Sequence, residues 1–280
     1  MWKRIITGVI LAPAFLLAMF YLPVNGVQIL TGLVLLGVTW EAGLLAGFRS
    51  RSSNLLFTAI LIIVGAAVVM LVPETHALTI YMIFSGIAGL WWLLDIFILS
   101  RFSVNDPGIY GSFKGRVSSI GLILLSTWFA INAMLIVDPR TPLLLVYVLV
   151  LVWIADSGAY FAGKFLGRKK LAQQVSPGKT IEGVIGGVAG VLIFASIFGN
   201  QVFNLAGKSL IFWIILSVFA GLISVVGDLN ESALKRVMGK KDSGSIIPGH
   251  GGFFDRADAI TAAVPVFYFG WQLMHKGNLV

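Results

Sequence analysis

Long apolar runs separated by short polar connectors cover the whole chain. Several runs reach 18–20 residues, which is enough for a helix to cross about 30 Å of hydrocarbon at about 1.5 Å per residue. Runs of this length predict helices rather than strands, because backbone polar groups in lipid must be paired within their own segment. The pattern predicts nine helices, at about 5–22, 28–46, 55–72, 77–99, 119–137, 143–163, 181–198, 209–229 and 259–274.

We therefore expect an all-α, polytopic integral membrane protein. Composition agrees, because 58% of the residues are hydrophobic and only 11% are charged, whereas soluble domains carry about a quarter. The chain has no cysteine, which excludes a disulfide framework, a thiolate metal site and a cysteine nucleophile. Its first residues resemble a signal peptide, but the many later spans favour an uncleaved first helix.

The cationic residues set the expected orientation. If the N-terminus is cytoplasmic, 17 of the 20 Lys and Arg residues fall on that side, and only Arg140, Lys208 and Lys276 fall on the other. This excess follows the positive-inside rule and supports an odd number of spans. We therefore expect a cytoplasmic N-terminus in a bacterial-type inner membrane. Topology alone explains many of these cations, but a basic face would also attract anionic lipid headgroups or nucleotides.

The connectors indicate where chemistry is to be expected. The longest ones, at 100–118, 164–180 and 230–258, all fall on the predicted cytoplasmic side. No internal repeat or low-complexity linker divides the chain, so we expect one membrane domain. Within it, we expect residues 1–150 to form a peripheral, lipid-facing part and residues 151–280 to carry the functional part.

A glycine-rich face marks the predicted helix at 181–198. Gly183 and Gly187, and likewise Gly186 and Gly190, recur at a spacing of four residues, which predicts close packing against another helix. A subunit interface is the alternative use of this face, and it leaves a homodimer open.

Four predicted helices that run toward the cytoplasm each carry one acid shortly before their first cytoplasmic cation. The four acids are Glu41, Asp95, Asp156 and Asp228. Each carboxylate should lie roughly 9–12 Å below the cations. On the predicted helices that enter the membrane from the cytoplasm, the acids near the first turn should lie at a similar depth; these are Glu182, Asp255 and Asp258. Ionisable groups inside a membrane usually face a cavity, a partner or a functional site. For Glu41 and Asp95, pairing with a nearby Arg or Lys is the competing interpretation.

The segment 176–180, Ser-Pro-Gly-Lys-Thr, ends one basic connector. Pro177 and Gly178 predict a turn that exposes N–H groups at the start of a helix, and Lys179 adds a positive charge, which suits phosphate oxygens. The spacing is not that of a P-loop, because Gln173 stands where the first glycine belongs. An ordinary capping turn is the alternative.

A second polar segment runs from Asp228 to Asp258. Cations follow Asp228 at helical spacing, glycines surround His250, and Asp255 and Asp258 share one helical face. Carboxylates among cations suit Mg²⁺ and a polyphosphate, because Mg²⁺ takes one or two carboxylates and completes its shell with water and phosphate oxygens. The competing interpretations are helix capping by Asp255, stabilisation of the first turn by Asp258 and an ordinary loop position for His250.

These residues resemble the signature of the phosphatidate cytidylyltransferase (CDP-diacylglycerol synthase) family. The thirteen matching residues are Ser232, Lys235, Arg236, Lys241, Asp242, Gly244, Pro248, His250, Gly251, Gly252, Asp255, Arg256 and Asp258. Segments 156–171 and 176–183 resemble the family's other polar block. The specific resemblance therefore covers about residues 153–258, whereas residues 1–150 match only as membrane spans.

The resemblance implies a nucleotidyltransferase that converts CTP and phosphatidate into CDP-diacylglycerol and pyrophosphate, with Mg²⁺ required and a second cation left open. CTP would enter from the cytoplasm while the lipid phosphate rests at the acyl boundary and attacks the α-phosphorus in line. Positioning and charge neutralisation carry such a transfer. The expected partners are these two substrates and membrane lipids, without nucleic acid.

The resemblance also implies roles for individual residues. The predicted catalytic residues are Asp228, Asp255, Lys235 and Arg236. The predicted metal ligands are Asp228 and Asp255, with Asp156 and Asp258 as further candidates. The residues predicted to bind substrate are Ser176, Lys179, Ser232, Lys241, His250, Gly251, Gly252 and Arg256.

Two other functions stay open. Another CTP-using membrane enzyme, such as a lipid-alcohol kinase or an ether-lipid cytidylyltransferase, would use similar metal and phosphate chemistry. An ion-coupled transporter would use buried acids to relay protons, but it predicts inverted repeats and acids near the midplane. The acids of this chain favour the cytoplasmic half instead.

Overall fold

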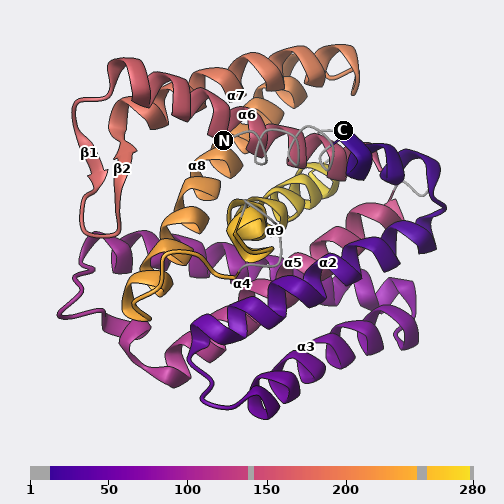
Figure 1. Cartoon of the computed structure of the whole chain (residues 1–280). Coiled ribbons are helices and arrows are strands. Elements are labelled where there is room, and N and C mark those ends of the chain that lie inside the picture. The colour runs from indigo at the N-terminus through magenta and orange to yellow at the C-terminus, as the bar shows by residue number, and fades with distance from the viewer. Residues whose placement is uncertain (1–12, 138–141, 245–250, 278–280) are drawn as a thin grey trace.

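The computed structural model describes residues 13–137, 142–244 and 251–277 of the chain, and most of them are helical (Figure 1). Residues 13–21 are helical, and they precede a series of longer helices. These are α2 (Val24–Ala46), α3 (Arg51–Leu71), α4 (Glu74–Ser100), α5 (Phe113–Val137), α6 (Leu143–Leu166), α7 (Ile181–Gln201), α8 (Gly207–Val237) and α9 (Phe254–Lys276).

Each of these helices corresponds to one predicted span. The first predicted span, at 5–22, lies only partly within the described residues. In the described part of the chain, the seven helices α2 to α8 are long and apolar enough to cross a membrane. The expected all-α, polytopic membrane fold is confirmed.

Helix α9 corresponds to the last predicted span but is not among the helices that are apolar enough to cross a membrane. It runs through the middle of the bundle (Figure 1) and packs against α8, α4 and α5. Ala262, Ala263, Val264, Phe267 and Tyr268 are fully buried there. Small and aromatic side chains fill this interior, so α9 is stabilised by packing between helices rather than by contact with lipid.

The glycine face of α7 packs against α6. A Cβ atom on Gly187 would lie 2.8 Å from the carbonyl oxygen of Ala155, and one on Gly158 would lie 2.7 Å from that of Gly186. The two backbones therefore approach so closely that only glycine fits at these positions. The predicted packing face is confirmed, and it is used within the chain. A homodimer stays a prediction.

Between α6 and α7 the chain forms an antiparallel hairpin of two short strands, β1 (Lys170–Ala172) and β2 (Ser176–Thr180). The turn predicted at Pro177 and Gly178 is wrong, because both residues lie in β2 and the turn is at 173–175. A two-stranded ribbon accepts proline because each strand is an edge, so the missing N–H need not be paired. Thr180 then caps α7, since its Oγ1 accepts a hydrogen bond from the Gly183 N–H at 3.1 Å.

The basic connectors meet at one end of the bundle. The Arg116 Nε at the start of α5 donates to the Ala46 carbonyl at 2.9 Å, which ties it to the end of α2. The Lys240 Nζ beyond α8 donates to the Leu44 carbonyl at 3.4 Å. These contacts bring two of the basic connectors to the end of α2, and the predicted cytoplasmic orientation of this end stays a prediction.

A further polar cluster ties α4 to α8. Buried Asp95 accepts hydrogen bonds from the Tyr110 hydroxyl, in the short 3₁₀ helix Gly108–Gly111, and from the Asn230 Nδ2 at 2.9 Å. No ion pair of Asp95 occurs among the described residues. The Arg or Lys partner considered for Asp95 is therefore not observed, because neutral donors already satisfy its two oxygens.

The close approach of α6 and α7 can be tested with two glycine variants. Gly187→Ala should lower the free energy of unfolding by about 1–3 kcal/mol, because the added methyl group overpacks the interface. Gly89→Ala is the control, since a Cβ at that position meets nothing within 4 Å and alanine favours a helix. Thermal unfolding of both variants in one detergent measures the difference. Equal midpoints would show that α6 and α7 do not pack through Gly187.

Candidate functional site

A polar pocket of about 450 Å³ lies between α6, α8, the end of β2 and the start of α7. Asp156 lines it from α6, Lys179 from β2 and Asp228 from α8. The Lys179 Nζ lies 2.5 Å from the Asp228 Oδ2. This ion pair fixes the hairpin against α8 and places one positive and one negative charge in the wall of the pocket.

Two more acids stand near Asp228. The charges of Asp156 on α6 and Asp258 on α9 interact with the charge of Asp228. A Cβ on Gly227 would lie 2.6 Å from the backbone oxygen of Asp258, so α8 and α9 come close at this point. Three helices that are distant in sequence thus bring three carboxylates to one region, as the shared depth of the acids predicts.

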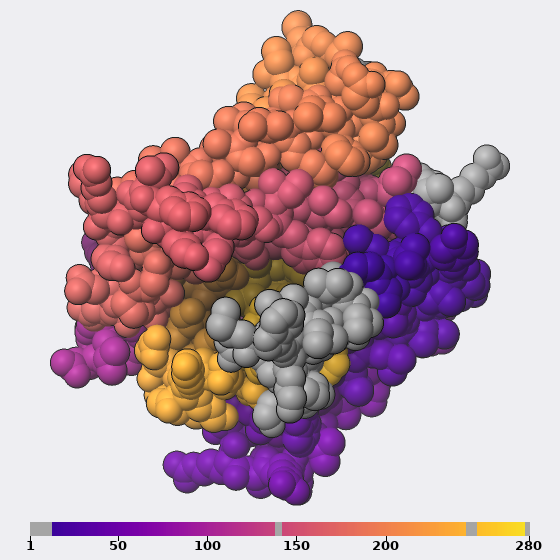
Figure 2. Space-filling view, turned by 45° about the horizontal axis from the view of Figure 1, so that its top comes forward, coloured from indigo at the N-terminus to yellow at the C-terminus, as the bar shows by residue number. Residues whose placement is uncertain are grey.

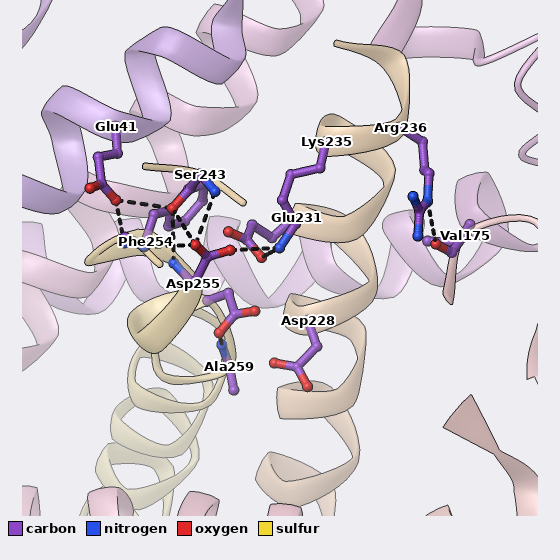
Figure 3. A network of polar contacts seen from close by, with 12 residues as sticks. Glu41, Val175, Asp228, Glu231, Lys235, Arg236, Ser243, Phe254, Asp255 and Ala259 are labelled. Carbon is purple, nitrogen blue, oxygen red and sulfur yellow. Dashed lines mark hydrogen bonds and ion pairs between the residues drawn. The ribbon is translucent and has the colours of Figure 1, made fainter. Parts of the chain in front are cut away.

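Lys235, about two turns beyond Asp228 on α8, lies between two carboxylates (Figure 3). Its Nζ is 2.5 Å from the Glu231 Oε2 and 2.7 Å from the Asp255 Oδ1. Glu231 is only 1% exposed, and a buried charge of this kind requires its partner. Glu231 is not among the residues predicted from the sequence, although the spacing of a Glu four residues before a Lys is a signal for an ion pair on a helix.

The other oxygen of Asp255 is held by the connector between α8 and α9. Its Oδ2 accepts hydrogen bonds from the Ser243 N–H at 2.9 Å and the Gly252 N–H at 2.8 Å, and the Ser243 hydroxyl lies at 3.0 Å. Gly251 adopts a φ of +80°, which glycine accommodates without strain. Asp255 thus accepts hydrogen bonds from the connector and pairs with Lys235, and its functional role stays a prediction.

Arg236 points away from this cluster (Figure 3). Its Nε donates to the Val175 carbonyl at 3.1 Å, in the turn of the hairpin. The guanidinium group predicted as catalytic therefore holds the hairpin that carries Lys179.

The remaining predicted residues are spread around these two clusters. Ser176 begins β2, and Ser232 lies on α8 one turn beyond Asp228. Lys241 is exposed on the connector after α8, and Gly251 and Gly252 support Asp255. Arg256 stands in the first turn of α9. His250 lies outside the described residues.

The predicted sharing of one ion by Asp228 and Asp255 stays a prediction. In the structure these two carboxylates contact different lysines, Lys179 and Lys235. Within the described part of the chain, no three His, Asp or Glu side chains are grouped in a way that would hold a metal ion.

A second pocket, of about 600 Å³, adjoins the start of α9. Apolar side chains from α2, α5, α6 and residues 14–19 form most of its walls, and Arg256 is the one charged residue among its described lining. In Figure 2 the yellow segment that includes α9 is set back beneath α6. Helix α6 borders both pockets, with Trp153 on the apolar one and Asp156 on the polar one.

Comparison with known proteins gives matches over the whole chain. The profile described as the Cytidylyltransferase family matches residues 2–274. A phosphatidate cytidylyltransferase from Pseudomonas aeruginosa is 36% identical over 271 residues, which are 95% of this chain and 94% of that protein. Another from Haemophilus influenzae is 54% identical over 128 residues, which are 45% of this chain and 44% of that protein. A third, from Bacillus subtilis, is 45% identical over 123 residues, or 44% of this chain and 45% of that protein.

The matching profile spans the N-terminal helices as well as the motif residues around Asp228 and Asp255. The resemblance seen in the motif thus extends to the rest of the chain, and this integral membrane protein belongs to the cytidylyltransferase family.

Proposed function

We propose that this chain transfers the cytidylyl group of CTP to phosphatidate, forming CDP-diacylglycerol and releasing pyrophosphate. The observation that carries the proposal is the presence of two pockets along α6, one polar with Lys179 and Asp228 in its lining and one apolar with Arg256 in its lining. A nucleotide phosphate requires the first environment and an acyl chain requires the second. The relative from Pseudomonas aeruginosa, named as a phosphatidate cytidylyltransferase, supports this assignment.

In this reaction an oxygen of the phosphatidate phosphate attacks the α-phosphorus of CTP. The bond from that phosphorus to the oxygen bridging the β-phosphate breaks, and pyrophosphate leaves with the bonding electrons. The attacking phosphate is already anionic at neutral pH, so no strong general base is needed. The chain's contribution is to align the two substrates and to neutralise negative charge.

Lysine and arginine side chains supply this neutralisation. Lys179 and Lys235 are held by carboxylates at 2.5–2.7 Å, so their ammonium groups are fixed before substrate arrives. Arg256 borders the apolar pocket, where a guanidinium group suits the phosphate of a lipid. Arg236 acts on the reaction by holding the hairpin, and through it Lys179.

The proposed reaction requires a magnesium ion, and one or two of the acidic residues would hold it. Asp156, Asp228 and Asp258 offer oxygen ligands around one region, and Mg²⁺ commonly binds one or two carboxylates and takes its other ligands from water and phosphate. Asp255 is the further candidate, and its oxygens now contact Lys235, Ser243 and Gly252. A magnesium ion bound by these residues would neutralise phosphate charge. A second cation stays open.

The active site should face the cytoplasm from a bacterial inner membrane. The basic connectors meet at the end of the bundle where Lys235 and Asp255 lie, and cytoplasmic ends carry an excess of Lys and Arg. CTP would then reach the polar pocket from water, while phosphatidate would place an acyl chain in the apolar pocket.

Substrate choice tests the proposal directly. The protein, reconstituted in vesicles with phosphatidate and Mg²⁺, should release pyrophosphate with CTP or dCTP and only slowly with ATP, GTP or UTP. Replacing phosphatidate by a lipid alcohol separates this function from that of a lipid kinase. Turnover of the lipid alcohol but not of phosphatidate, or solute uptake driven by pH without nucleotide, would point to one of the other functions.

The two aspartates give a second prediction. Asp228→Asn and Asp255→Asn should each lower the turnover number at least ~10²-fold, because each removes a charged contact near the reacting phosphates. Asp106→Asn, at an exposed position, is the control and should keep full activity. Pyrophosphate release measured across a Mg²⁺ titration checks this. Near-normal turnover in both site variants would show that these carboxylates do not serve the reaction.

The apolar pocket gives a third prediction. Val34→Trp should raise the KM for phosphatidate about 10-fold and leave the KM for CTP unchanged, because the larger side chain fills pocket volume that an acyl chain needs. Leu33→Trp is the matched control, since the neighbouring Leu33 is 63% exposed on the outer face of α2. Equal KM values for phosphatidate in the two variants would place the acyl chain elsewhere.

A further inference from the structure

Glu41, in α2 of the N-terminal half, contacts the connector between α8 and α9 and the start of α9, more than 200 residues later (Figure 3). Its Oε2 accepts a hydrogen bond from the Ser243 hydroxyl at 3.0 Å and another from the Phe254 N–H at 3.0 Å. Glu41 is 1% exposed, and no ion pair of its carboxylate occurs among the described residues. The Arg or Lys partner considered for it is therefore not observed.

The contacts of Glu41 continue to Asp255 through Ser243. The Ser243 hydroxyl lies 3.0 Å from the Glu41 Oε2 and also 3.0 Å from the Asp255 Oδ2. The Asp255 N–H in turn donates to the Ser243 Oγ at 3.2 Å. One hydroxyl group thus bridges the two carboxylates, and the other oxygen of Asp255 pairs with Lys235. This chain of contacts runs from α2 to the lysine on α8.

The glycines of the motif make room for this contact. A Cβ atom on Gly244 would collide with the Glu41 carboxylate, and its three nearest atoms would all belong to Glu41. A Cβ on Gly252 would collide with the same carboxylate and with the Ser243 hydroxyl. One turn earlier on α2, a Cβ on Gly37 would lie 2.8 Å from the ring of Phe253. The connector therefore lies directly on α2, with the Glu41 side chain filling the space that the glycines leave.

From this geometry we propose that Glu41 is a positioning residue for the start of α9 and for the connector that precedes it. It accepts hydrogen bonds from Ser243 and Phe254 and so fixes the start of α9, which holds Asp255 against Lys235. The proposal rests on the proposed function only where the readout is enzyme activity. It assigns Glu41 the role of hydrogen-bond acceptor. The Glu41 Oε1 has no hydrogen-bond partner in the described part of the chain, so the acceptor role belongs to Oε2.

Three substitutions separate this role from others. Glu41→Ala should lower kcat ~10- to 100-fold, because small displacements of catalytic groups cost this much. Glu41→Gln should stay within about 3-fold of the parent, since its amide oxygen replaces Oε2 as acceptor. Glu41→Asp keeps the charge but is one methylene shorter, so it should lose activity like Glu41→Ala. Activity retained by the aspartate and lost by the glutamine would show that the charge matters, which would overturn the proposal.

Thr39→Val serves as the control on the same helix. The Thr39 hydroxyl donates only within α2, to the Leu35 carbonyl at 2.7 Å, and Thr39 is buried. This variant should keep the parent's kcat and KM even where its thermal stability falls. A purely structural role for Glu41 would instead lower activity in proportion to the folded fraction, with kcat per folded molecule unchanged, and this result would also overturn the proposal.

Ser243→Ala tests whether Glu41 affects activity through its hydrogen bond with Ser243. If Glu41 acts partly through Ser243, the double variant with Glu41→Ala should lose less activity than the product of the two single losses, because residues in one network are not additive. Strict multiplication of the two losses would contradict the bridge through Ser243.

A spectroscopic readout is independent of the reaction. The chain contains no cysteine, so Asp242→Cys, at an exposed position next to Ser243, accepts a single nitroxide label. The label should move faster in Glu41→Ala than in the parent and should be unchanged in Glu41→Gln and Thr39→Val. If the parent shows no transfer from CTP to phosphatidate, the proposed function fails, and label mobility still decides the role of Glu41. Equal mobility in the parent and Glu41→Ala would refute the positioning role.

Discussion

Carboxylates inside an apolar bundle need partners, and this requirement organises the active end of the molecule. An acid that is removed from water and left without a donor or a cation would destabilise the fold. Asp255 meets the requirement with Lys235 and the connector, and Asp228 meets it with Lys179. These pairs bring α8, α9 and the hairpin together. The contacts that stabilise the buried acids therefore also position the lysines proposed to neutralise phosphate.

The N-terminal half takes part in this arrangement. Asp95 on α4 accepts a hydrogen bond from Asn230, two residues beyond Asp228, and Glu41 on α2 contacts the connector before α9. Residues 1–150 were expected to form a peripheral part, and that division stays a prediction. These contacts nevertheless give two of its acids a direct connection to the helices that carry the motif.

The location of the site follows from the two kinds of substrate that the proposed reaction joins. A nucleotide requires charge and water, whereas an acyl chain requires a dry apolar space. Helix α6 borders both a polar and an apolar pocket, through Asp156 and Trp153. The close packing of α6 and α7 through glycines supports this geometry, because it brings Asp156 and Lys179 to the same pocket.

The sequence by itself determined the number and type of the helices, because segment length and hydropathy follow from the thickness of the membrane. It also identified the residues of the motif, since their spacing along the chain is local. Only the tertiary structure decided which side chains meet across different helices. The pair of Glu231 and Lys235 is local to α8, but Asp255 gave no sequence signal for its contact with Ser243, and Arg236 contacts the hairpin rather than the acids. The reason is physical: such pairings join helices far apart in sequence, and packing of the whole bundle sets which side chains meet.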